Sequence, residues 1–543
     1  MTIRTIAQAD YLDRVKGAWL GKMVGVSYGI PTEFHFTHRI ADTSELPTWT
    51  PDTINEAYIE DDLYIPFAFM KELDTHGLDV SPRQMAIDLY PYAFEFWGGH
   101  YRNFELGIAP PSSGNPSYAR TPDSLSYSFA ADYSGLIAPG LVNVPATLAD
   151  RYARLLVYGD GVFGGAYIGA MYTEAFFTSD LRQIIAAGLG VIPTDSWLFQ
   201  AVSDTITWHD EAPGDFTATW QKIMDKYFWD PAYNWIDWPY GGRTEGIALD
   251  TKLNCAFITM ALLYGEGDIA KTLQIVTRAG ADSDSNPANA LGILFATKGY
   301  DAIPAEYKSG LNPGRFRYVD LGYDDAVALT ARLAEKTIVA QGGRVTTTSG
   351  RVMYEIPVTE PVRLASENSV SPTYAPLTTF TPEEMSRLSK PGLLDPGFEE
   401  SWHTDLYSPY AGLTGDKIWV GLDLRQGKAH TGDNNAYIVN QGYGTGGIYQ
   451  KRIAIEPGST YELSCWVRTS VNFPTGRLLV TTPEADHSVP IATTTFTATT
   501  TYRQVVLRFE SGTHAIVDIG ITYDGNGDNT FVQVDDFGLR KVQ

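Results

Sequence analysis

Cysteine is nearly absent from this 543-residue sequence, which contains only Cys255 and Cys465. We expect these two residues to lie in different domains, so the sequence excludes a fold built on a disulfide framework. Long apolar runs are missing too, since no window approaches the ~18 consecutive apolar residues that span a bilayer. The sequence therefore predicts a soluble protein with no membrane partner.

A signal peptide is also missing from the start of the sequence. Residues Met1 to Asp13 lack the order of charged, apolar and small residues that marks a secretory signal. The compartment stays open, because the protein is secreted or periplasmic if a signal was removed and cytoplasmic otherwise.

Basic residues are in deficit. Lys and Arg number 40 against 64 Asp and Glu, which gives a formal net charge of −24. This charge repels a phosphate backbone, so we expect no nucleic-acid partner. Acidic surfaces mostly serve solubility, but an excess of carboxylates also suits a protein that binds divalent cations. The composition predicts no particular oligomeric state.

The length exceeds what one hydrophobic core organises, so we expect a multidomain protein. From about residue 10 to about 340 the apolar residues follow helical spacing. After Gln341, period-two runs such as YELSCWV take over. We predict an all-α domain over residues 1–340, a linker or domain extension over 341–390, and an all-β jelly-roll sandwich over 391–543.

Glycine recurs with a helical period near the start of the predicted helical domain. Gly17, Gly21, Gly25 and Gly29 stand at every fourth position. This spacing places a strip without side chains along one helix face. We therefore expect another helix to approach this face very closely.

Two runs of carboxylates each precede a helix-like segment. Glu60, Asp61 and Asp62 come before LYIPFAFM, while Asp282 and Asp284 stand in GADSDSN before ALGILFATKG. Each run alone has a plain explanation, because acidic side chains cap helix N-termini. Two such clusters in one domain would repel each other unless a cation lay between them. We therefore predict a site for Mg²⁺, Mn²⁺ or Ca²⁺, with a dinuclear site as the economical interpretation.

Four segments, in this order, carry a family resemblance: GAWLGKMVGVSYGIPTEF, EDD, GDGVFGGAYIGAMYTEAFF and LLYGEGDIAKTLQIVTRAGADSDSNPANALGILFATKGYDAIP. Over about residues 10–310 the chain resembles the ADP-ribosylglycohydrolases. The resemblance implies an all-α fold with two metal ions, held between a Thr-Asp-Asp-like motif and an Asp-x-Asp-Ser/Thr motif. It also implies hydrolysis of a glycosidic bond, since the family cleaves a ribofuranosyl bond of ADP-ribose.

The resemblance assigns the metal ligands position by position. Asp61, Asp62 and Asp284 would hold one cation. Asp282 and Ser285 would hold the other together with Asp284, which would bridge the two ions.

Glu60 departs from the family pattern. It stands where the family has a hydroxyl ligand, and its side chain is longer and charged. We keep Glu60 among the expected ligands and leave the geometry and identity of the first metal open.

Three residues are candidates for the chemistry itself. Glu33, in GIPTEF, matches the family's glutamate near the substrate and is the candidate acid or base. Asp62 is assigned a catalytic role beside its role as a ligand. Asp160, in YGDGVFGG, either lines the same cleft or caps a helix, and flanking glycines permit close backbone approach.

A histidine beside an aspartate has a plainer interpretation. His209 stands beside Asp210, but no nucleophile motif accompanies them. We expect a surface or capping histidine there.

The segment from Leu393 to Val542 opens with LLDPGFEESW and closes with FVQVDDFGLRKV. It resembles a carbohydrate-binding module of the galactose-binding-like jelly-roll type. The resemblance implies a structural Ca²⁺ held by Glu399 and Asp536, for which ordinary strand-end charge is the alternative. Four aromatic residues are candidates for a glycan-binding face: Trp402, Tyr407, Tyr410 and Trp419.

Together the two resemblances lead to one hypothesis and two alternatives. The hypothesis is a metal-dependent glycoside hydrolase that cleaves a furanosidic linkage, of the arabino- or galactofuranoside type, in a carbohydrate substrate. A glycan-binding module suits polysaccharide degradation because it raises the effective concentration of enzyme at its substrate. The alternatives are an ADP-ribosyl hydrolase and a glycan-binding protein without catalysis.

Overall fold

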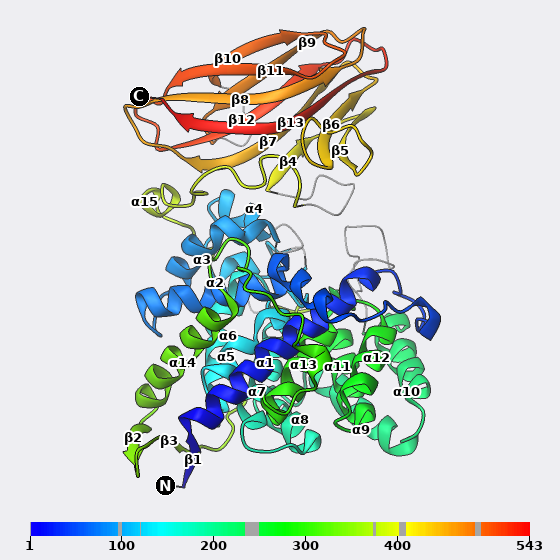
Figure 1. Ribbon diagram of the computed structural model, residues 1–543, viewed down its shortest axis with the longest axis vertical. Helices are drawn as coiled ribbons and strands as arrows, with labels where there is room; N and C mark the ends of the chain where they lie inside the picture. Colours follow the sequence, from blue (N-terminus) through cyan, green and yellow to red (C-terminus); the bar gives the residue numbers. More distant parts are fainter. Residues whose placement is uncertain are drawn as a thin grey trace. The chain divides into compact units, whose positions relative to one another are not determined.

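The computed structural model describes residues 2–95, 100–119, 121–233, 249–372, 376–400, 409–483 and 490–542. The chain forms two compact units, of which the first extends to Phe380 and the second begins at Thr381. The first unit is predominantly helical and the second is a β-sandwich (Figure 1). The predicted fold class, a helical domain followed by an all-β sandwich, is therefore confirmed.

The first unit, called the helical unit below, is built around long helices joined by irregular loops. Several helices begin at an aspartate whose carboxylate accepts backbone N–H groups of the first turn, as Asp180, Asp215 and Asp268 do. The helices are α1 (Gln8–Gly29), α2 (Asp61–His76), α3 (Pro82–Leu89), α4 (His100–Glu105), α5 (Asp132–Leu136), α6 (Asn143–Tyr152), α7 (Asp160–Ala175), α8 (Leu181–Gly190), α9 (Trp197–Glu211), α10 (Phe216–Ile223), α11 (Thr251–Gly265), α12 (Ile269–Ala279), α13 (Ser285–Lys298) and α14 (Tyr323–Ala340).

The glycine strip of α1 packs against α13, and the two helices run side by side (Figure 1). A Cβ atom added at Gly21 would lie 2.3 Å from the Leu291 carbonyl oxygen, and one added at Gly25 would lie 2.3 Å from the Pro287 carbonyl oxygen. No real Cβ approaches a backbone oxygen so closely. The expected close approach of a second helix is confirmed, and the partner helix is the one that begins directly after the Asp-x-Asp motif.

The helical unit also contains a small antiparallel sheet in the order β1-β3-β2, which the all-α prediction did not include. β1 (Ile3–Ala7) pairs with β3 (Arg351–Pro357), which pairs with β2 (Arg344–Thr348). Residues beyond this sheet stay attached to the helices, since the Leu364 amide donates to the Val191 carbonyl (2.9 Å). Residues 341–372, for which the sequence left a linker or a domain extension open, thus lie on the helical unit.

The second unit contains two five-stranded sheets, in the orders β10-β9-β12-β7-β4 and β11-β8-β13-β6-β5. Their inner faces enclose a core that includes Leu463, Cys465, Val467 and Ile519, as the period-two pattern predicts. The elements are α15 (Pro382–Met385), β4 (Tyr410–Leu413), β5 (Ile418–Leu424), β6 (Asn434–Asn440), β7 (Thr445–Ala454), β8 (Thr460–Thr469), β9 (Thr475–Thr481), β10 (Pro490–Thr497), β11 (Arg503–Glu510), β12 (Ile516–Asp524) and β13 (Thr530–Lys541).

The structure also places the two cysteines and describes the length and apolarity of the helices. Cys255 and Cys465 are free, buried and in different units, so no disulfide joins them. Among the helices of the described residues, none combines the length and apolarity needed to cross a bilayer.

Candidate functional site

Two loops that are distant in the sequence pair at the end of α1. The Phe34 amide donates to the Ala281 carbonyl (3.1 Å), and the Ala281 amide donates to the Phe36 carbonyl (3.0 Å). Gly29 permits this contact, because a Cβ there would lie 2.1 Å from the Ser283 carbonyl oxygen. The pairing brings Glu33, just after α1, to the Asp-x-Asp loop that precedes α13.

Glu33, Asp282 and Asp284 form what we call the carboxylate cluster. One oxygen from each side chain lies within 4.8 Å of the others. Both aspartates are buried, at 3% exposure each, while Glu33 is partly exposed. Of the polar atoms in the described residues, Asp282 Oδ1 and Asp284 Oδ1 belong to the few that are buried with no hydrogen-bond partner. These oxygens are therefore available to a ligand.

The electrostatics of the carboxylate cluster disfavour three negative charges. Burial raises the pKa of Asp282 to about 8 and raises the pKa of Asp284 well above its usual range. Burial and the neighbouring Asp284 likewise raise the pKa of Glu33 well above its ordinary value. Buried carboxylates without a counter-charge hold their protons in this way. A cation among these oxygens would reverse the effect.

The second acidic run reaches the same region from the start of α2. Glu60 occupies the N-cap position with extended backbone, so Asp61 and Asp62 form the first helical turn. Ser285 Oγ donates to Asp62 Oδ2 (2.9 Å), which ties the start of α2 to the start of α13. Glu60 and Asp61 both contribute to the raised pKa of Glu33 through their charges. Of the metal ligands predicted for the helical domain, Asp282 and Asp284 belong to the carboxylate cluster, Asp62 is tied to α13 through Ser285, and Glu60 and Asp61 act on Glu33 through their charges. Their role as ligands stays a prediction.

Lys22 contacts one of the predicted metal ligands, a contact that the sequence reasoning missed. It lies fully buried in α1, and its ammonium group contacts Asp62 Oδ1 (3.2 Å), Asp132 Oδ2 (2.5 Å) and the Phe129 carbonyl oxygen (2.6 Å). Burial opposes the ammonium charge, but the two carboxylates raise the pKa of Lys22 above its ordinary value. Lys22 opposes the effect of burial on Asp62, but burial outweighs it and the pKa of Asp62 stays above its ordinary value. A lysine within a glycine-rich helix was the available signal.

Asn254, in α11, positions the Asp-x-Asp loop. Its side-chain oxygen accepts hydrogen bonds from Asn286 Nδ2 (2.7 Å) and from the Asp282 amide (3.4 Å). Its side-chain amide donates to the Asp250 carbonyl (2.9 Å) one turn earlier. The loop is thus anchored from α11 as well as from α1.

The carboxylate cluster and its surroundings pass a simple test for metal binding. Mg²⁺ and Mn²⁺ take several hard oxygen ligands, and the site offers carboxylates, a hydroxyl and two oxygens that no donor satisfies. Lys22 is a cation near this site, but its ammonium group also forms an ion pair with Asp132, which lies outside the cluster. Lys22 therefore does not take the place of a metal ion among the cluster's oxygens. The donor set therefore fits a divalent cation, and the number of cations remains a prediction.

Asp160 lies in a second acidic cluster beside the first. It begins α7, and its Oδ1 accepts the Leu198 amide (3.2 Å). Burial raises the pKa of Asp160 to about 6 and that of the neighbouring Asp123 to about 8. Lys252, paired with Asp250, faces both carboxylates. Asp250 is the N-cap of α11 and Asn254 lies in its first turn, so the start of this helix contacts both Lys252 and the Asp-x-Asp loop.

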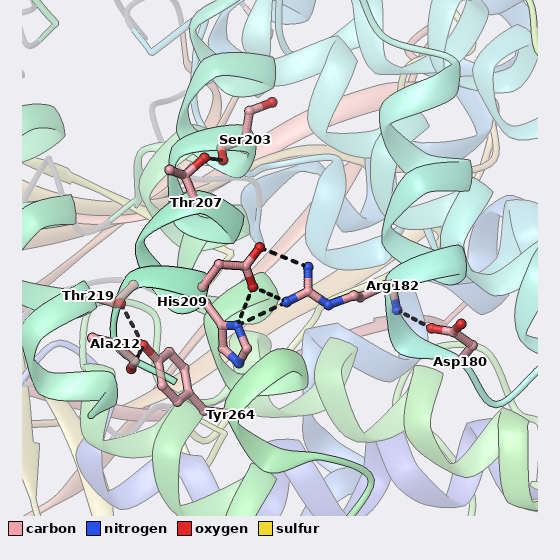
Figure 2. Close-up of polar contacts among 9 residues, drawn as sticks. Asp180, Arg182, Ser203, Thr207, His209, Ala212, Thr219 and Tyr264 are labelled. Atoms are coloured by element: carbon pink, nitrogen blue, oxygen red, sulfur yellow. Dashed lines mark hydrogen bonds and ion pairs between the residues drawn. The ribbon is translucent and has the colours of Figure 1, made fainter. Parts of the chain in front are cut away.

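His209 belongs to a surface ion-pair network (Figure 2). Its Nδ1 lies 3.2 Å from Asp210 Oδ1 and 3.1 Å from an Arg182 guanidinium nitrogen. Arg182 also pairs with Asp210, and both of these side chains are about half exposed. The arrangement joins α8 to the end of α9, so the interpretation of His209 as a surface or capping residue is supported by its contacts.

In the β-sandwich, Glu399 and Asp536 approach the same glycine, Gly397. The Glu399 carboxylate accepts the Asp433 and Asn434 amides at 3.0 to 3.1 Å. Asp536 accepts the Thr431 hydroxyl at 2.7 Å, and its other oxygen lies 2.6 Å from His430 Nδ1. The predicted calcium site stays a prediction, with both carboxylates placed at the loop before β6.

The four aromatic candidates for the glycan face have different outcomes. Trp402 and Tyr407 lie outside the described residues. Tyr410 was a wrong choice, because it is 4% exposed and packs its ring against Phe398 (4.7 Å between centroids). Trp419 is 49% exposed on β5 and keeps its candidacy.

Known proteins were compared with this chain by sequence and by structure. A family model of the ADP-ribosylglycohydrolases matches residues 7–342. No curated protein matches the sequence. A solved "ADP-ribosylglycohydrolase-related protein complex" is 16% identical, with 61% of this chain and 99% of that chain covered and a TM-score of 0.40. TmCBM61 in complex with β-1,4-galactotriose is 16% identical (28% and 99% covered, TM-score 0.22). The N-terminal cellulose-binding domain of Cellulomonas fimi β-1,4-glucanase C is 22% identical (26% and 93% covered, TM-score 0.21).

Proposed function

Because the chain belongs to the ADP-ribosylglycohydrolase family, we propose that it is a metal-dependent glycoside hydrolase. The observation that carries the proposal is the pair of buried, unsatisfied oxygens on Asp282 and Asp284 beside the partly exposed Glu33. Hydrolytic sites need a group that moves protons next to a group that stabilises developing charge. The carboxylate cluster can supply both.

The residues around the carboxylate cluster have two proposed roles, binding of cations and positioning of a ligand. Asp61, Asp62, Asp282 and Asp284 would hold two divalent cations, with Ser285 and Glu60 as further ligands. When bound, the cations would polarise the reacting centre or a water molecule. Lys22 orients Asp62, since its ammonium group lies 3.2 Å from Asp62 Oδ1.

Glu33 is the proposed proton-transfer residue. It is partly exposed, whereas Asp282 and Asp284 are buried, so it is the member of the cluster that a substrate reaches. In the absence of a cation, burial and then the neighbouring negative charges raise its pKa well above the ordinary value. A carboxyl group that a substrate reaches beside the ligands of a bound cation can donate or accept a proton during hydrolysis.

We assign a furanosidic glycan as substrate. The family cleaves a bond of a five-membered sugar ring, and the second unit offers a surface suited to carbohydrate. On the outer face of the β11-β8-β13-β6-β5 sheet, Tyr437 stands opposite Gly421 on one side and Gln533 on the other, and Gln533 stands opposite Arg468. Exposed Trp419 lies on the same face of β5 as Gly421. Gln533 is 5% exposed; it donates to Asp423 (2.6 Å) and accepts from Arg468 (2.7 Å), so it supports this face from below. The rings of Trp419 and Tyr437 are the groups that suit the apolar faces of sugar rings.

An ADP-ribosyl hydrolase is the second candidate function, favoured by the family itself. The surroundings of the carboxylate cluster are strongly acidic, and such surroundings repel a pyrophosphate. The third candidate, a glycan-binding protein without catalysis, rests on Glu60 in place of the family's hydroxyl ligand. The intact aspartates at the remaining ligand positions favour an enzyme.

The proposal is tested by product release from a panel of nitrophenyl furanosides and pyranosides, together with arabinan and galactan. The assays are run with Mg²⁺ or Mn²⁺, with EDTA, and with an Asp282→Asn variant as the matched control. Release from one furanoside that both EDTA and the variant abolish supports the proposal. Release from an ADP-ribosylated protein alone selects the second candidate, and inactivity on every substrate selects the third.

A further inference from the structure

A pocket of about 550 Å³ lies at one end of the β-sandwich, and Trp419 is not among its lining residues. Three loops line it: residues 414–417 between β4 and β5, residues 441–444 between β6 and β7, and Gly527 between β12 and β13. Its volume falls within the roughly 300–1,000 Å³ that small-molecule sites occupy. The pocket is therefore large enough to hold a sugar residue.

The loops of this pocket are held in place by backbone hydrogen bonds. The Gly525 amide donates to the Gly444 carbonyl (3.1 Å), and the Gly527 amide donates to the Gly442 carbonyl (2.9 Å). Asn440, fully buried beneath them, accepts the Gly442 amide (2.9 Å) and donates to the Gly444 carbonyl (2.8 Å). Loops fixed in this way bind without an added ordering cost.

Tyr443 gives the pocket an aromatic wall. Its side chain is 83% exposed, the largest exposure among the large hydrophobic residues of the described chain. The ring rests against Gly527, where an added Cβ would lie 2.6 Å from the ring. A rigidly backed and solvent-exposed ring at the rim of a pocket offers its free surface to the apolar face of a ligand.

The polar lining excludes other ligand classes. Asp416 and Lys417 contribute opposite charges, so the pocket selects neither an anion nor a cation. Gln441 adds an amide that both donates and accepts hydrogen bonds, and the Thr445 hydroxyl, which donates to Asp524 (2.6 Å), can still accept one. Sugar hydroxyls need this mixture, whereas a lipid chain needs an apolar lining.

We propose that this loop pocket is a second carbohydrate-binding site, which takes a single neutral sugar residue such as the end of a glycan chain. The inference goes beyond the proposed function, which uses the helical unit and the outer sheet face. A chain end bound here and a chain segment bound on the sheet face would give one molecule two points of attachment to the same polysaccharide.

The test measures binding of D-galactose, D-glucose, D-xylose and L-arabinose to the full chain by saturation-transfer NMR and calorimetry. Monosaccharides are used because they contain no glycosidic bond to cleave. The variants are Tyr443→Ala and Gln441→Ala. Val471→Ala is the matched control, because Val471 is 81% exposed in the β8–β9 loop and does not line the pocket. Trp419→Ala reports on the sheet face.

At least one monosaccharide is expected to bind. Tyr443→Ala should weaken its affinity by about tenfold or more, as loss of a central aromatic contact does. Val471→Ala and Trp419→Ala should leave the affinity unchanged. The proposal is overturned if no monosaccharide binds, if Tyr443→Ala and Gln441→Ala both bind as the wild type does, or if Trp419→Ala alone removes binding. None of these outcomes depends on whether the helical unit hydrolyses a furanoside.

Discussion

Replacement of Asp123 by asparagine is expected to stabilise the helical unit at neutral pH. Asp123 is 7% exposed, accepts the Ser369 hydroxyl at 2.5 Å and lies beside Asp160. Burial, followed by the charge of Asp160, raises its pKa from 3.8 to about 8. Asparagine keeps the acceptor for Ser369 and carries no charge at any pH.

The magnitude follows from linkage between protonation and folding. Between pH 4 and pH 8 the folded chain holds a proton on Asp123 that the unfolded chain has released, so this residue lowers the free energy of unfolding as pH rises. About 1.4 kcal/mol per pH unit over roughly three pH units gives a ceiling of about 4 kcal/mol at pH 7. Coupling to Asp160 lowers the ceiling, and we expect a gain of about 2–3 kcal/mol.

Thermal unfolding at pH 4, 5.5, 7 and 8.5 measures the effect. For a unit of this size the gain corresponds to a rise of roughly 2–5 °C in Tm at pH 7. The difference between variant and wild type should shrink as pH falls and be smallest at pH 4, close to the pKa of 3.8 that Asp123 has in the unfolded chain. Glu56→Gln, at an exposed position, is the control for loss of one negative charge. A variant that is less stable at pH 7, or whose gain is the same at pH 4 and pH 7, would refute the reasoning.

Three further predictions concern other contacts. Gly25→Ala should lower the free energy of unfolding by about 3 kcal/mol or more, because its Cβ would lie 2.3 Å from the Pro287 carbonyl oxygen. Gly214→Ala is the control and should be nearly neutral, because a Cβ there meets no atom within 4 Å. Chemical denaturation compares the two variants. Lys22→Met should lower the free energy of unfolding by about 3–5 kcal/mol in the same assay, because it removes the ammonium group that pairs with two buried carboxylates. A loss below about 1 kcal/mol would contradict the contacts assigned to Lys22. Trp419→Ala should weaken binding to an insoluble polysaccharide in pull-down assays and leave hydrolysis of a small furanoside unchanged; equal binding by variant and wild type would remove Trp419 from the glycan face.

The features that the sequence predicted well are those with a local signature. The glycine repeat of α1 needs only one helical period to be recognised, and it does meet α13 at backbone distance. Two acidic runs in front of apolar helices predicted that Asp62 and Asp284 lie near one site, and the structure joins their helices through Ser285. Like charges that a chain concentrates at two places are informative because their repulsion must be relieved.

The features that escaped prediction depend on contacts between distant residues. Lys22 pairs with Asp132, 110 positions away. The glycine-rich helix indicates that Lys22 is buried, but no local pattern identifies its partner. Tyr410 has the residue type of a sugar platform, but its side of β4 faces the core rather than solvent. The β1-β3-β2 sheet joins the start of the chain to residues beyond 340, which periodicity along the sequence cannot register.

The most direct test of the metal-dependent mechanism measures bound Mn²⁺ and furanoside hydrolysis on the same samples of wild type and Asp284→Asn. Wild-type protein freed of metal and dialysed against Mn²⁺ should hold two ions per helical unit and regain its activity in proportion to the ions bound. Asp284→Asn, which alters the proposed bridging ligand, should lose both ions and the activity together while it keeps the same far-UV circular dichroism. Wild-type protein that hydrolyses the furanoside with no ion bound, or a variant that retains both ions and full activity, would contradict the assignment of this site.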